Sequence, residues 1–162
     1  MVPLIVVTVV FVALRSAGAL GITPLQDWRL CLRWAVALML LVTASAHWGP
    51  KRADLVAMVP PFFPQPELLV TLTGIFEIAG AIGLVYARTS RVAAVCLALL
   101  FIAMFPANIY AAQHQLTIGG KPVTELPLRT FVQIFLIAAA VAIARGKRES
   151  RAAVTMEECR AS

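Results

Sequence analysis

Five strongly polar side chains fall within long apolar runs or at their ends, where they have the chemistry to bind a ligand. They are His47, Glu77, Asn108, Arg129 and Gln133. An imidazole and a carboxyl can exchange protons with a bound molecule, and amide and guanidinium groups can orient its oxygen atoms. A polar side chain inside a membrane span is costly unless it has a partner, so each position is a hypothesis for a binding site.

Depth along the apolar runs places these side chains in the same half of the bilayer. At about 1.5 Å per residue, Glu77 lies about 14 Å into its span and Asn108 lies roughly 24 Å into the next one. His47 ends its span, and Arg129 and Gln133 are one turn apart at the start of the last span. Because neighbouring spans alternate in direction, the sequence predicts one polar site that opens toward the outer face.

Each residue also has a structural interpretation, which the sequence leaves open. His47 and Arg129 stand where interfacial side chains face lipid headgroups. Glu77 can form an interhelical pair without any ligand. Asn108 and Gln133 belong to the residue types that hold membrane helices together by hydrogen bonds.

The elements that must hold these residues are membrane helices. Of the 162 residues, 60% are hydrophobic and 14% are charged, whereas a soluble domain carries about a quarter charged residues. Five segments offer the roughly 20 mostly apolar residues that a transmembrane helix needs. They cover residues 2–20, 31–47, 68–86, 92–112 and 128–144. The prediction is an all-α, polytopic helix bundle over residues 1–145, followed by a polar tail over 146–162 that is disordered or a surface helix.

The basic residues orient this bundle in the cell membrane. They gather in one set of connections and in the tail, which the positive-inside rule places in the cytoplasm. They are Arg15, Arg29, Arg33, Arg88 and Arg91, with Arg145, Lys147, Arg148, Arg151 and Arg160 in the tail. The amino terminus is therefore expected outside. No Lys or Arg precedes Leu4, so residues 2–20 lack the basic start of a signal peptide.

Local features indicate the shape of the site. Glu77 shares a helical face with small residues that include Gly80, which predicts close contact with another helix. Pro106 interrupts its helix and is expected to release the carbonyl of Ile102. The segment Met58–Pro66 holds four prolines and two phenylalanines. It is expected either to lie over the bundle as a lid or to form a rigid connector at the interface.

Other chemistries are not favoured. The basic residues are not interleaved with aromatic ones on a common face, which argues against nucleic-acid binding. Cys31, Cys96 and Cys159 form no CxxC pair, and the first two lie in apolar runs, where a free Cys acts as a small hydrophobe. One histidine and one carboxylate fall short of a metal site, so neither a metal nor an intrinsic cofactor is expected. His114 is expected in a solvated loop.

The stretch from about Leu32 to Ala144 resembles the DoxX family of small bacterial membrane proteins. The motifs that carry the resemblance are Ser45–Trp48, Met58–Pro61, Leu72–Ile78, Phe105–Tyr110 and Leu126–Arg129 followed by Gln133. The resemblance implies a four-helix core in the bacterial inner membrane, with residues 2–20 as an added helix. Family relatives include the DoxD-type subunit of thiosulfate:quinone oxidoreductase, which implies quinone-linked redox work. The chain departs from the family pattern at Trp48, where members often have another aromatic, and at Arg129, where Gln is common.

The leading hypothesis is an accessory subunit that binds a quinone or a lipid-like amphiphile beside a membrane oxidoreductase partner. His47 and Glu77 would exchange protons with the ligand, and Asn108, Arg129 and Gln133 would orient it. The alternative is a structural or assembly protein whose polar residues only lock the helices. A small transporter is disfavoured because the five spans show no inverted repeat. Whether the chain itself catalyses a reaction stays open.

Overall fold

The structure, a computed structural model, describes residues 2–161 and the side chains of residues 2–146. Its long helices are α1 (Val2–Ala19), α2 (Trp28–Ala44), α4 (Pro66–Val85), α5 (Ser90–Gln113) and α6 (Leu126–Ala161). Shorter elements connect them: η1 (Thr23–Gln26), η2 (Ser45–His47), α3 (Arg52–Ala57), β1 (Thr117–Ile118) and β2 (Lys121–Pro122). The protein is therefore all-α, apart from one small hairpin.

Five helical segments are long and apolar enough to cross a membrane: Val2–Ala19, Trp28–His47, Pro66–Val85, Ser90–Gln113 and Leu126–Gly146. The number of spans is as predicted, and the largest difference in a boundary is at the second span, which begins at Trp28 instead of Cys31. The side chain of Asp27 accepts a hydrogen bond from the backbone N–H of Arg29. This cap starts the helix before its apolar run begins, since it satisfies one of the free N–H groups of the first turn.

The outer surface of the bundle is apolar. Large aliphatic side chains such as Ile82, Leu99 and Ile134 are more than half exposed, while Glu77 and Gln133 are buried. A water-soluble protein rarely exposes so much contiguous apolar surface. This inside-out distribution is the organisation of a multi-pass membrane protein.

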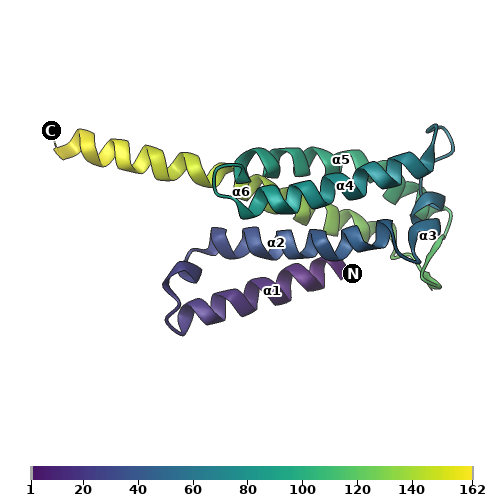
Figure 1. The fold of residues 1–162 in the computed structure, drawn as a ribbon, viewed down its shortest axis with the longest axis horizontal. Helices are drawn as coiled ribbons and strands as arrows, with labels where there is room; N and C mark the ends of the chain where they lie inside the picture. The colour runs from purple at the N-terminus through teal and green to yellow at the C-terminus, as the bar shows by residue number, and fades with distance from the viewer. Residues whose placement is uncertain (1, 162) are drawn as a thin grey trace.

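Four of the long helices form a ring, and the fifth lies outside it. α2 packs on α4, α4 on α5, α5 on α6, and α6 returns to α2. α1 packs mainly against α2 and lies along its outer side (Figure 1). Only 11% of the α1 span is buried, compared with 50% of the α2 span. α2 is therefore the central element, and α1 is an addition to a four-helix bundle.

Two arginines of α2 bind backbone carbonyls of neighbouring helices at the end of the bundle near the α1–α2 turn. Arg33 donates from its guanidinium to the carbonyls of Leu84 and Val85, at 2.9 Å each, where α4 ends. Arg29 donates to the carbonyl of Gly146, at 3.0 Å. The Arg33 contacts satisfy the last carbonyls of α4 and place positive charge at the negative end of its dipole, while the Arg29 contact joins α2 to α6.

α6 continues well past its apolar segment. It is one helix from Leu126 to Ala161 and extends beyond the other helices toward the C-terminus (Figure 1). The sequence predicted a polar tail over 146–162, and the side chains from residue 147 onward lie outside the described part of the chain.

The proline-rich segment corresponds to the connector and not to a lid. Met58 and Pro60 are buried, but Phe62 is 72% exposed and stacks on Phe63 at a ring-centroid distance of 4.3 Å. The loop between α3 and α4 projects away from the bundle (Figure 1). Proline stiffness holds the tip outward, because residues with fixed φ and no N–H cannot fold back into a helix.

A hairpin and a short helix lie together at the same end of the molecule. β1 pairs antiparallel with β2 around Gly119 and Gly120, whose positive φ values of 60° and 73° suit glycine. The N–H of Gly119 donates to the carboxylate of Asp54 in α3, at 2.7 Å. This bond joins the α5–α6 connection to the α2–α4 connection.

Gly80 lies at the contact between α4 and α5. It is buried, and a Cβ built there would lie 2.5 Å from Cδ2 of Leu97. The predicted contact of the Gly80 face with another helix is confirmed. Membrane helices associate through such small residues, because lipid already satisfies apolar side chains and only close packing favours contact.

We expect Gly80→Leu to separate α4 from α5 and to destabilise the protein by about 1–3 kcal/mol, since overpacking forces neighbouring atoms apart. Thermal unfolding in detergent measures the effect. The matched control is Ala79→Leu, one residue away on an exposed face of α4, which should unfold at the wild-type temperature. Equal unfolding temperatures for the two variants would contradict the packing described here.

Candidate functional site

His47 is held tightly at the end of α2. It closes the 3-10 turn η2 and is 5% exposed. Its Nδ1 lies 2.6 Å from the carbonyl oxygen of Val70 in α4. Gly74 permits this approach, because a Cβ there would lie 2.8 Å from Cβ and Cγ of His47. The imidazole is therefore wedged against the backbone of the neighbouring helix.

Glu77 projects from α4 toward the same histidine. It is 4% exposed, and the hydroxyl of Thr43 lies 2.8 Å from Oε2. The other carboxyl oxygen, Oε1, lies 3.8 Å from Nε2 of His47. The expected proximity of Glu77 and His47 is confirmed, and Thr43, which lies one turn below His47, is a further partner. This distance suits an ion pair and is long for a direct hydrogen bond.

The hydrogen-bond partners fix where protons reside. A carbonyl oxygen can only accept, so Nδ1 of His47 carries a proton and donates it to Val70. Nε2 therefore faces Oε1 of Glu77 either as a bare acceptor or as the second N–H of an imidazolium. One proton can therefore lie between the two residues and move between Nε2 of His47 and Oε1 of Glu77.

Thr43 can accommodate either charge state of Glu77. Its hydroxyl lies within reach of both Oε2 of Glu77 and the carbonyl of Leu40, the latter at 3.1 Å. With an ionised Glu77, the hydroxyl donates to the carboxylate. With a protonated Glu77, the carboxyl donates to the hydroxyl oxygen and the hydroxyl turns to Leu40. The hydroxyl of Thr43 therefore keeps a hydrogen-bond partner whether Glu77 gains or loses its proton.

Arg52 is a residue of this site that sequence reasoning did not single out. Its Nη1 donates to the carbonyl of His47 at 2.8 Å, and its Nη2 donates to the hydroxyl of Thr71 at 2.9 Å. It therefore ties the end of α2 to the first turns of α4. The sequence feature that could have identified Arg52 is its position just after a helix end, where backbone carbonyls need hydrogen-bond donors.

The other three predicted residues form a second hydrogen-bonded group between α5 and α6. Nη1 of Arg129 donates to Oδ1 of Asn108 at 2.7 Å, and Nδ2 of Asn108 donates to Oε1 of Gln133 at 3.2 Å. Arg129 also donates to the carbonyl of Thr124. Gln133 donates in turn to the backbone carbonyl of Phe101. The chain of bonds locks the two helices in register.

Gln133 binds a backbone carbonyl of α5 near Pro106. Pro106 lies inside α5 and was predicted to release the carbonyl of Ile102 for this site. The side chain of Gln133 donates to the carbonyl of Phe101, one residue before Ile102. Phe101 lies on the buried face of α5, whereas Ile102 is 54% exposed on the outer face and points its part of the helix away from α6.

The five predicted residues thus converge on one end of the bundle as two groups. His47 and Glu77 join α2 to α4, while Asn108, Arg129 and Gln133 join α5 to α6. Among the described side chains no hydrogen bond links the two groups. Asn108, expected near Glu77, finds its partners on α6 instead.

Other chemistry-bearing residues lie apart from this site. His114 is exposed at the end of α5, as expected, and stacks on Tyr110. Cys31 is buried and Cys96 is exposed, both as free thiols, and the side chain of Cys159 lies outside the described residues. The described residues include no group of three or more His, Cys, Asp or Glu side chains placed to hold a metal.

Comparison of the sequence with known protein families finds a match. Residues 36–144 match the family described as Domain of unknown function (DUF8561). The chain belongs to this family. The match leaves out α1 and contains all five predicted site residues. No curated protein and no solved structure matches the chain.

The tautomer of His47 can be tested directly, because the chain has only two histidines. In a His114→Gln background, nitrogen NMR of isotope-labelled histidine reports His47 alone. We expect a protonated Nδ1 in the wild type and in Glu77→Gln, since Val70 holds that proton, and a changed Nε2 resonance in Glu77→Gln. A bare Nδ1 in the wild type would rule out the geometry.

Proposed function

We propose that this chain is a membrane-embedded accessory subunit that binds a quinone, or an amphiphile with similar oxygen atoms, at the His47–Glu77 pair. The observation that carries the proposal is the fixed Nδ1–H of His47, which leaves Nε2 facing a buried carboxyl at 3.8 Å. A buried acid–base pair with one mobile proton is suited to exchanging that proton with a ligand oxygen. A purely structural contact needs no such mobile proton.

Quinone reduction is the reaction class that this chemistry fits. A quinone carbonyl takes up one proton for each electron that it accepts. Nε2 of His47 or Oε1 of Glu77 would supply that proton, and the pair would recover it from water at the end of the bundle. The electrons would come from a partner oxidoreductase, so the role of the chain is binding and proton transfer.

Trp48 offers a surface for the ligand ring. It follows His47 directly, with ring centroids 6.1 Å apart, and about half of its surface is exposed. The indole lies against α4 at Gly74, where an added Cβ would be 2.8 Å from Cη2 of Trp48. A planar head group could stack on the indole while its apolar tail stays in lipid.

Resemblance to the DoxX family supports the ligand class. The ring of α2, α4, α5 and α6 has the helix number that the resemblance implies for the family core, with α1 added. Quinone-linked relatives in that family favour a quinone over other amphiphiles. The resemblance contributes the ligand class, and the geometry contributes the residues.

The alternative function, helix locking without a ligand, is favoured by the second group. Asn108, Arg129 and Gln133 bind one another and a backbone carbonyl, so their hydrogen bonds are made inside the protein. They need no ligand to be satisfied. We therefore assign the ligand to His47 and Glu77, and assign a structural role to these three.

Tryptophan fluorescence can measure quinone binding at this site. Trp28→Phe and Trp34→Phe remove the two tryptophans of α2 and leave Trp48 as the reporter. We expect a short-chain benzoquinone to quench Trp48 and Glu77→Gln to weaken that binding about tenfold or more, because a hydrogen bond to an ionisable group is lost. The control is Glu67→Gln, an exposed carboxylate in the first turn of α4, which should bind as the wild type does.

The two functions give different results in this assay. Unchanged quinone affinity in Glu77→Gln, together with a lower unfolding temperature, would support helix locking and sink the ligand proposal. Weaker affinity with an unchanged unfolding temperature would support ligand binding. A wild-type protein that is not quenched at all would also refute the proposal.

The proposed orientation places the His47–Glu77 site on the outer side of the cell membrane. The opposite end carries Arg88, Arg91 and Arg145, which are exposed, and the positive-inside rule places such basic residues in the cytoplasm. At the site end, Arg52 and Arg129 are engaged inside the protein. The charge difference between the two ends thus supports an outer amino terminus and a cytoplasmic carboxyl terminus.

Cysteine labelling tests this orientation. In a background with Cys96→Ser and Cys159→Ser, a cysteine at exposed Lys51 should react with an impermeant thiol reagent in intact cells, and a cysteine at exposed Arg88 should not. Both should react after the cells are opened. Labelling at Arg88 alone in intact cells would reverse the orientation.

A further inference from the structure

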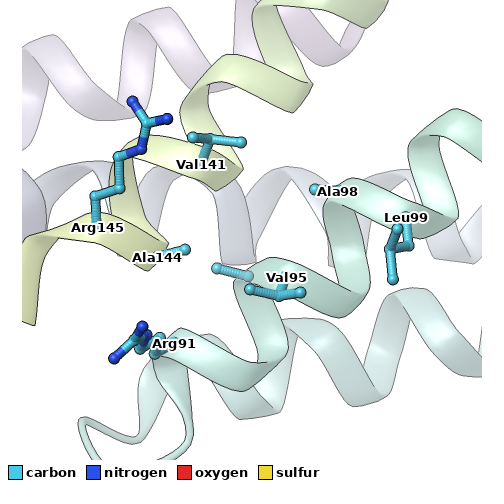
Figure 2. A pocket seen from close by; sticks show the side chains of 8 residues that line it. Arg91, Val95, Ala98, Leu99, Val141, Ala144 and Arg145 are labelled. Carbon is cyan, nitrogen blue, oxygen red and sulfur yellow. The ribbon is translucent and has the colours of Figure 1, made fainter.

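A groove runs between α5 and α6 at the end of the bundle away from His47 and Glu77. Its volume is about 260 Å³. Figure 2 shows its walls, which are small and aliphatic side chains of the two helices, and the arginine that each helix contributes at one end. The lining residues are Arg91, Ala94, Val95, Ala98, Leu99, Val141, Ala144 and Arg145.

The groove opens onto the surface that faces lipid. Val95 and Leu99 are exposed on α5, at 47% and 62%. From Arg91 to Leu99 the wall extends about 12 Å along the helix axis, at about 1.5 Å per residue. The groove therefore follows the direction in which an acyl chain lies in a bilayer.

The two arginines stand at the level of the lipid headgroups. Arg91 is in the first turn of α5, and Arg145 is next to the end of the last span at Gly146. Both are exposed, and within the described part of the chain neither has a hydrogen-bond or ion-pair partner. Elsewhere at this end, Arg29 and Arg33 are bonded to backbone carbonyls. Arg91 and Arg145 thus remain available to an external anion.

We propose that this groove binds an anionic glycerophospholipid. Its phosphate lies at the end of the groove that Arg91 and Arg145 line, and one acyl chain lies against Val95, Ala98 and Val141. Guanidinium groups suit phosphate because their planar N–H donors match its oxygen atoms. Charge selects this occupant: a second copy of the chain would bring like-charged arginines to the groove, whereas a phosphate neutralises them.

Native mass spectrometry tests the proposal on the full chain in detergent with equal amounts of phosphatidylglycerol and phosphatidylcholine. We expect the wild type to retain phosphatidylglycerol preferentially. The double variant Arg91→Gln/Arg145→Gln should lose about fivefold of that preference for each arginine, since a basic residue near an anionic headgroup contributes about that factor. The matched control is Arg88→Gln, which removes an exposed arginine outside the groove and should keep the preference.

A second variant tests the apolar wall. Ala98→Phe fills the groove and should reduce retention of both lipids, with no change of preference. Addition of inorganic phosphate should not displace phosphatidylglycerol, because phosphate lacks the acyl chain. The proposal is overturned by a double variant that keeps the wild-type preference, by equal losses in Arg88→Gln and the double variant, or by displacement with phosphate alone.

Discussion

The arrangement of the rest of the bundle depends on the contact between His47 and Glu77. A carboxyl and an imidazole inside an apolar assembly must find partners within the protein, because lipid offers none. That requirement brings the end of α2 against α4, and Gly74 is the residue that makes room for the ring. Arg52 then holds the turn in place through the carbonyl of His47.

The small residues of α4 make room for side chains from two neighbouring parts of the bundle. Gly74 receives His47 from α2, and further along the helix Gly80 and Gly83 receive Leu97 and Ala93 from α5. The polar pair and the apolar contact therefore depend on the same helix register. A shift of α4 that improved one contact would disturb the other, since close packing tolerates little displacement.

The arginines at the two ends of the bundle have different surroundings. At the His47 end, Arg52 and Arg129 are turned inward and bind backbone and side-chain oxygens. At the other end, Arg29 and Arg33 bind backbone carbonyls of α6 and α4, while Arg91 and Arg145 are exposed beside an apolar groove. The bundle thus has an end whose arginines bind groups within the protein and an end that presents exposed arginines beside the groove.

The sequence by itself determined the membrane class, the five spans and the shared end of the bundle that holds the polar residues, because apolar length and helical rise are properties of a single segment. It also predicted the Gly80 contact and the nearness of His47 to Glu77. Only the tertiary structure separated the five polar residues into two groups, joined Thr43 to Glu77, added Arg52, and gave Gln133 the carbonyl of Phe101 as its partner. These outcomes depend on which helices are neighbours and how each is rotated, and neither quantity is encoded in the depth of a residue along its own helix.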